Sequence, residues 1–201
     1  MKNVIAAIFD VESEGYHAIA KLRQIPDTGS YTILQMALIK KENGGVKVCE
    51  IFDSGVDTSD DTVLGGVLGG LVGILGGPLG VLLMSSYGMA AGNLMDLGDA
   101  ADGLSLIETV ADKLGDDTVA LVIYADERNE SVIDAHLADF KVEIRRYDAA
   151  AIDQEVEDAI TMQEEMARQA RLDFRKEVKD NIKQKHEEKV DKIKAAIEKH
   201  D

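Results

Sequence analysis

The sequence predicts an α+β fold: a ferredoxin-like split βαβ sandwich with an inserted glycine-rich helical hairpin and a long C-terminal helix. Three observations predict it. Short apolar runs of strand length alternate with helical patterns up to about residue 147. Residues 62–95 carry no formal charge and many glycines, and residues 149–201 contain neither glycine nor proline. The ferredoxin-like domain is therefore expected in two parts, residues 1–60 and 97–148, with an insert at 61–96 and a helical tail at 149–201.

The first half of the domain follows from apolar runs and turn signals. Residues 2–9 form an apolar run of strand length, and the polar side chains that begin at Asp10 can cap a helix that reaches about Gln24. Two β-rich runs, 31–40 and 46–53, are separated by Asn43-Gly44-Gly45, a strong signal for a tight hairpin turn. This part of the chain reads β-α-β-β.

The second half completes the pattern after the insert. Residues 103–114 place apolar side chains on one helical face, and the Val/Leu/Ile-rich run 118–125 predicts a strand. The sum is β-α-β-β-α-β, the split βαβ arrangement. A helix at about 129–138 and a strand at 141–147 are expected to extend it.

Composition excludes some functions and favours one compartment. The formal charge of −16, the isoelectric point near 4.6 and the aromatic content of 4% argue against nucleic-acid binding, because a polyanion is repelled and few rings can stack on bases. Cys49 is the single cysteine, so it has no intramolecular disulfide partner, and the N-terminus has no signal-peptide pattern. We expect a cytoplasmic protein.

The glycine spacing in the insert predicts close helix packing. Glycines recur every four residues, which on a helix makes a groove without side chains that another backbone can approach. Each interior glycine costs roughly 0.8–1 kcal/mol relative to alanine, so close packing or lipid must offset them. The predicted helix-packing residues are Gly65, Gly66, Gly69, Gly70, Gly73, Gly76, Gly77, Gly80, Gly88 and Gly92, with Pro78 at the hairpin turn.

The surroundings of the insert leave two interpretations open. Two arms of about 15 residues are each about 22 Å long, somewhat short of a bilayer core of about 30 Å, so a re-entrant wedge is as consistent as two crossings. Acidic residues flank the insert on both sides, whereas cytoplasmic flanks of membrane helices usually carry Lys or Arg. The hairpin therefore either inserts into a membrane from its cytoplasmic face or packs between subunits of a soluble homo-oligomer. In either case the insert is expected to be removable without unfolding the domain.

The layout of residues 2–147 resembles a known family. A ferredoxin-like domain interrupted between its third strand and second helix by a hydrophobic Gly-Gly-x-x-Gly-Gly hairpin, here Gly65-Gly66 and Gly69-Gly70, is similar to an uncharacterised bacterial domain of unknown function. Its members are often described as membrane or general-stress-related proteins. The resemblance implies no catalytic residues, and the charged tail is an addition to it.

The sequence gives little support for catalysis, a metal or a cofactor. The histidines His17, His136, His186 and His200 lack metal-ligand spacing. Asp10 and Asp53 end two strands expected to be neighbours, so they could form a carboxylate pair, although capping and strand termination are the ordinary explanations. We therefore expect a non-enzymatic protein without cofactor or metal.

The tail, 149–201, is expected to be helical almost throughout. Residues 151–165 carry acids and no bases, whereas 168–199 are richer in Lys and Arg than in Asp and Glu. Its apolar residues are largely spaced by four, which makes a stripe that drifts around the helix and a poor heptad seam. A solvated helix, an oligomerising coil and a membrane-surface helix all fit this pattern.

The sequence thus predicts a self-assembling protein whose hairpin inserts into a membrane or packs between subunits. The expected partners are further copies of the chain, bound through the hairpin, with the tail as a second candidate contact and membrane lipid as the alternative. A small-ligand-binding or stress-responsive regulatory module is the competing function, and it rests on fold analogy.

Overall fold

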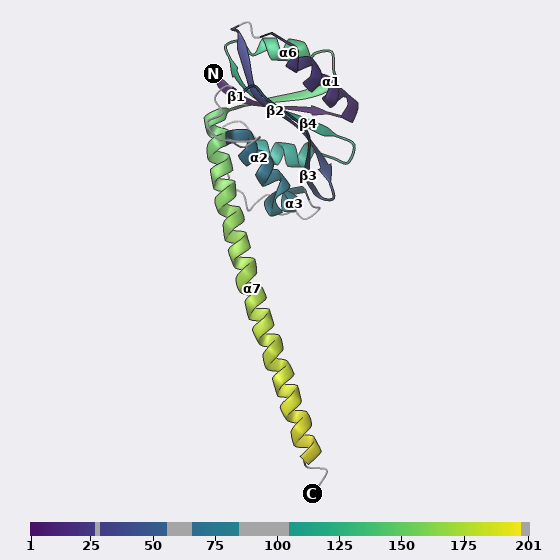
Figure 1. The fold of residues 1–201 in the computed structure, drawn as a ribbon, viewed down its shortest axis with the longest axis vertical. Helices are drawn as coiled ribbons and strands as arrows, with labels where there is room; N and C mark the ends of the chain where they lie inside the picture. Colours follow the sequence, from purple (N-terminus) through teal and green to yellow (C-terminus); the bar gives the residue numbers. More distant parts are fainter. Residues whose placement is uncertain (27–28, 56–65, 85–104, 198–201) are drawn as a thin grey trace. The chain divides into compact units, whose positions relative to one another are not determined.

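The computed structural model describes residues 1–26, 29–55, 66–84 and 105–197, with side chains as far as residue 185 (Figure 1). These residues form an α+β structure with a five-stranded antiparallel sheet and six helices, the last of which is long. The strands are β1 (Lys2–Phe9), β2 (Tyr31–Glu42), β3 (Gly45–Asp53), β4 (Val119–Glu127) and β5 (Val142–Asp148). The helices are α1 (Glu12–Arg23), α2 (Gly66–Gly76), α3 (Pro78–Met84), α5 (Leu106–Lys113), α6 (Ser131–Leu137) and α7 (Ala149–Ile197).

The strands lie in the order β3-β2-β4-β1-β5, and every neighbouring pair is antiparallel. β1 and β2, which α1 connects, are separated by β4. In the same way β4 and β5, which α6 connects, are separated by β1. Two β-α-β units are therefore interleaved, and β3 is added at one edge.

Both faces of the sheet are covered. Side chains alternate between the faces of a strand, so Ile5, Ala7 and Phe9 of β1 point to one core while Val4 and Ala6 point to the opposite side. All five are fully buried. The first face packs against α1 and α6, and the second against α2 and α5 (Figure 1). The sheet is thus the middle layer of the unit Met1–Ile160.

The first turns of α7 belong to this same unit. Ala149, Ile152, Val156 and Ala159 are buried, in steps of three and four that place them on one helical face. From Thr161 onward the chain forms a second unit, 161–201.

The β2–β3 hairpin has the turn that the sequence predicts. Asn43 and Gly44 form a two-residue loop with φ of 55° and 79°. Positive φ at both central positions is typical of a type I′ turn, whose twist matches that of the two strands.

The edge strand β3 is held from the first face by Arg23, the last residue of α1. The Arg23 guanidinium donates to the Glu50 carboxylate and to the Ile51 carbonyl oxygen, and it lies 5.6 Å from the centre of the Phe52 ring. The end of α1 is therefore fixed to the outermost strand.

The strand order differs from the one expected from the sequence. The elements at 103–114 and 118–125 were expected to complete the split βαβ set, with 129–138 and 141–147 as an extension. Instead β5 pairs with β1, and α6 lies on the same face as α1, whereas α5 lies on the opposite face. Apolar periodicity specifies which side of an element is buried, but it does not specify its neighbour.

Candidate functional site

The described part of the glycine-rich segment consists of α2 and α3, which are bent by 62° relative to each other. Pro78 is the first residue of α3, where its missing N–H would have no helical partner in any case. The break therefore falls where Gly76-Gly77-Pro78 predicts it. The second arm of the predicted hairpin extends into residues 85–104, which lie outside the described residues.

The two sides of α2 differ completely in chemistry. Leu68, Leu71 and Leu75 are fully buried, and α2 contacts β2, β3 and β4. On the opposite side Gly66 and Gly73 are exposed, and a Cβ atom added at Gly73 would meet nothing within 4 Å. At 3.6 residues per turn, the positions 66, 69, 70 and 73 share one side of the helix. We call these four glycines the glycine face of α2.

Two glycines form close contacts within the chain. A Cβ at Gly70 would lie 2.5 Å from a methyl group of Val156, so this edge of the glycine face packs against α7. A Cβ at Gly80 would overlap the carbonyl group of Leu75, so the bend between α2 and α3 requires a glycine there.

The predicted packing residues are distributed as follows. Gly66, Gly73, Gly76 and Pro78 are exposed, Gly69, Gly70 and Gly77 are half-buried, Gly80 is buried, and Gly65, Gly88 and Gly92 lie outside the described residues. The structure thus places Gly66, Gly69, Gly70 and Gly73 on one side of α2 and Gly80 at the bend.

The first turns of α7 are also hydrogen-bonded to α5. The Glu155 carboxylate accepts hydrogen bonds from the backbone N–H groups of Leu106 (3.2 Å) and Ile107 (2.8 Å), which satisfies donors at the first turn of α5. Burial raises the pKa of Glu155, and the hydrogen bonds from Ile107 and Leu106 oppose that shift. The Tyr147 hydroxyl and the Thr109 hydroxyl form a hydrogen bond of 2.8 Å nearby.

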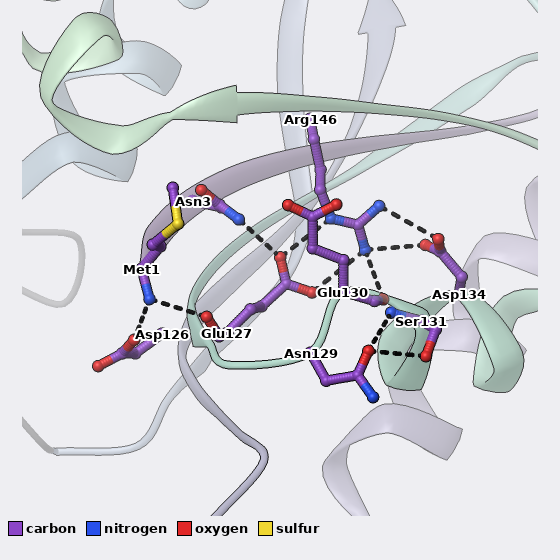
Figure 2. A network of polar contacts seen from close by, with 9 residues as sticks. All are labelled: Met1, Asn3, Asp126, Glu127, Asn129, Glu130, Ser131, Asp134 and Arg146. Atoms are coloured by element: carbon purple, nitrogen blue, oxygen red, sulfur yellow. Dashed lines mark hydrogen bonds and ion pairs between the residues drawn. The ribbon is translucent and has the colours of Figure 1, made fainter.

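A buried polar cluster surrounds Arg146 on β5 (Figure 2). Its Nε and Nη2 donate to the two carboxylate oxygens of Glu127, at 3.0 and 3.1 Å, and Nη2 also donates to Asp134 at 2.8 Å. Asn3 Nδ2 donates to Glu127 at 3.0 Å. The Glu127 side chain is fully buried, and that of Arg146 is 17% exposed. The cluster joins β1, β4, β5 and α6.

This cluster has a structural role. Both carboxylate oxygens of Glu127 accept hydrogen bonds within the chain, and the side chain is fully buried, so the carboxylate is not open to a ligand. Burial acts to lower the pKa of Arg146, but the hydrogen bonds to Glu127 and Asp134 outweigh that effect and raise the pKa. The guanidinium therefore stays charged. Sequence reasoning missed this cluster, because its members are far apart in the chain.

An open hollow of about 330 Å³ lies beside the end of β1. Its charged side chains form two ion pairs, Lys141 with Asp10 and Lys113 with Glu143. It is lined by Ile8, Asp10, Lys113, Thr118, Lys141, Val142 and Glu143. Its two lysines are held in these ion pairs, and the Thr118 hydroxyl donates to the backbone carbonyls of Lys113 and Gly115, so we assign no nucleophilic chemistry to the hollow.

The structure does not bring Asp10 and Asp53 together. Asp53 lies opposite Gln35 on β2, to which it is hydrogen-bonded at 2.9 Å, whereas β1 is two strands beyond β2. Across the sheet, Gln35 lies opposite Tyr124 of β4, and Tyr124 lies opposite Val4 of β1. Val4 is at the other end of β1 from Asp10. The carboxylate pair was considered because the two strands were expected to be neighbours, which they are not.

No family model matches the chain, and neither a curated protein nor a solved structure matches it.

Over the part of the chain that the structure describes, no group of three or more His, Cys, Asp or Glu side chains is placed to hold a metal ion. Within the same residues no single helix has the length and apolarity to cross a membrane, although α2 and α3 meet that criterion as a bent pair.

Proposed function

We propose that this protein is a non-enzymatic, self-associating protein, and that the glycine face of α2 is the surface on which a helix of a second copy packs. One observation carries the proposal: α2 buries its leucines in its own domain and presents glycines outward, with open space at Gly73. A helix without side chains on one face lets another backbone approach closely.

The energetics of α2 support this assignment. Each glycine in a helix interior costs roughly 0.8–1 kcal/mol relative to alanine, and alanine would fit at Gly73 because the position is open. The sequence nevertheless keeps glycine there. Close contact with a second backbone would offset this cost, since a methyl group at the contact would separate the two helices.

Packing between copies is favoured over insertion of α2 into lipid. Leu68, Leu71 and Leu75 are already shielded from water by the sheet and by neighbouring helices. Lipid insertion would move them from one apolar environment to another, so the roughly 0.8 kcal/mol per CH₂ that burial provides would not be gained again. The exposed glycine face offers little apolar side-chain area to lipid.

Size-exclusion chromatography with light scattering, with and without detergent, tests the proposal. We expect the protein to run as a discrete oligomer in plain buffer. Gly73→Leu should shift it to smaller species, because the new side chain blocks the contact and has no clash within the chain. Val81→Leu is the matched control, since Val81 is also exposed on this segment but lies outside the glycine face.

Two results would contradict the proposal. A monodisperse wild-type monomer would show that the glycine face has no partner. Pelleting with membranes that resists a high-salt wash and is reversed by detergent would show that lipid is the partner instead.

We also propose that the sheet is a ferredoxin-like core with an unusually large insert. The interleaving of β1-α1-β2 with β4-α6-β5, in the order β2-β4-β1-β5, supports this assignment. The insert then runs from β3 to α5 and includes the glycine-rich helices, and it covers the second face of the sheet.

A further inference from the structure

The unit 161–201 presents an apolar row on α7. Its members recur every four residues: Met166, Ala170, Phe174, Val178 and Ile182, and all five are exposed. Phe174 is 67% exposed and Ile182 65% exposed. Large apolar side chains gathered in one row on an otherwise charged helix are a recognised mark of an interaction surface. We call these five residues the apolar row.

The step of four fixes the geometry of any helix that packs here. Each step turns the row by about 40° around the helix, so the row is inclined to the helix axis. When two helices align ridges of this type, their axes cross at about −50°. The contact is therefore a crossing centred on Phe174.

The two sides of the apolar row carry opposite charges. The flank one residue after the row, at positions 167, 171, 175 and 179, contains Arg171, Arg175 and Lys179 and no acid. The flank one residue before the row, at positions 165, 169, 173 and 177, contains Glu165, Asp173 and Glu177 and no base. All six side chains are exposed. We call these the basic flank and the acidic flank.

This charge pattern selects both the partner and its direction. When two identical helices meet in the same N-to-C direction, each basic flank lies against the acidic flank of the other helix. When one helix is reversed, basic lies against basic and acidic against acidic. Flanking charges of this kind set partner choice and orientation in helix pairs.

We propose that α7 pairs with α7 of a second copy of this chain, in the same N-to-C direction, through the apolar row. Arg171 and Glu177, three residues before and after Phe174, are then the flank residues nearest the contact, and Arg171 of each copy lies on the same side of it as Glu177 of the other. This contact is separate from the glycine face of α2, so the two proposals can fail independently.

Cysteine crosslinking tests the direction on the full-length chain, with Cys49→Ala as the background. Val178→Cys, one step of the row from Phe174, should form a disulfide-linked dimer on mild oxidation, because the same position of both copies meets beside the crossing point. Leu172→Cys is the control, since Leu172 is 51% exposed but lies on the opposite side of α7. A mixture of Ala170→Cys and Val178→Cys should give homodimers and little mixed product.

Three results would overturn the pairing: no crosslink at Val178→Cys, equal crosslinking at Leu172→Cys, or mixed Ala170–Val178 product in excess of the homodimers. Because the crosslink reports one position on α7, the test does not depend on the glycine face. Loss of the crosslink with an unchanged effect of Gly73→Leu would leave the proposed function standing.

Charge reversal provides a second test in the Gly73→Leu background, which removes the contact through α2. Arg171→Glu and Glu177→Arg should each weaken dimerisation about tenfold, since each turns two symmetry-related attractive contacts into repulsive ones. The double variant should dimerise with an affinity within about twofold of the parent. If the two helices run in opposite directions, the double variant would not recover the affinity of the parent, and that outcome would overturn the proposal.

Discussion

The guanidinium of Arg146 holds the buried carboxylate of Glu127 in a bidentate ion pair, with Nε 3.0 Å from Oε2 and Nη2 3.1 Å from Oε1. The pair joins the C-terminal end of β4 to β5, and Asn3 adds a hydrogen bond from β1 (Figure 2). Three neighbouring strands are thereby fixed at one end of the sheet.

Arg146→Met should destabilise the protein by about 3–5 kcal/mol, because it leaves the fully buried Glu127 carboxylate without its countercharge. Urea denaturation followed by circular dichroism measures the change. Arg145→Met is the matched control on the same strand: Arg145 is 60% exposed and pairs with Glu143 at the surface, so its loss should cost about 1 kcal/mol or less. Equal losses for both variants would contradict the structural role of Arg146.

Glu155→Gln should change how stability depends on pH. Burial raises the folded-state pKa of Glu155 above its ordinary value of 4.5, so its contribution to stability is fully present below pH 4.5 and is lost as pH rises through the folded value. The free energy of unfolding of the wild type should therefore fall relative to Glu155→Gln as pH rises above 4.5. Parallel curves for the two proteins across that window would show that burial does not control this carboxyl.

Gly70→Leu should destabilise the protein and Gly73→Leu should not, although the two positions lie about one turn apart. Leucine at Gly70 would collide with Val156 and cost about 1–3 kcal/mol of stability through overpacking. Leucine at Gly73 enters open space within the chain and should leave the unfolding midpoint of the monomer nearly unchanged. Thermal unfolding of the two variants, at a protein concentration low enough to keep both monomeric, distinguishes them, and similar losses would mean that the outer side of α2 is already covered within the chain.

Replacing residues 62–95 with a short Gly/Ser linker should prevent stable folding. This reverses the expectation from the sequence, because α2 supplies Leu68, Leu71 and Leu75 to the core on the second face of the sheet. Each such side chain contributes about 1.5–3 kcal/mol, against a typical total stability of 5–15 kcal/mol. A soluble variant with a cooperative unfolding transition would restore the view that the insert is dispensable.

Much of the fold could be predicted from local patterns. The strand expected at 2–9 and β1 coincide, and the expected tail helix corresponds to α7. The Asn43–Gly44 turn was predictable because few other sequences adopt positive φ at both positions. The break between α2 and α3 was likewise predictable from Pro78.

The pairing of strands was not predictable in the same way. An apolar alternation shows that Val4 and Ile5 face opposite sides of a sheet, but it holds no information on whether β3 or β5 lies beside β1. The Arg146 cluster was hidden for a related reason: Asn3, Glu127 and Arg146 are ordinary polar residues until the sheet brings them together. The spacing of α2 shows that the helix has two sides, with leucine at 68, 71 and 75 and glycine at 66, 69 and 73. It does not show that the leucine side is buried in the core of the domain.

The contact of Arg23 with β3 affects how this protein can grow into larger particles. An edge strand is a template for strand addition and hence for fibrils. Here the carbonyl of Ile51 already accepts from Arg23, and Lys47, 52% exposed on the same strand, places a charge in the path of an incoming strand. Concentrated solutions should therefore resist thioflavin-positive aggregation, and Arg23→Ala should shorten the lag before fibrils form.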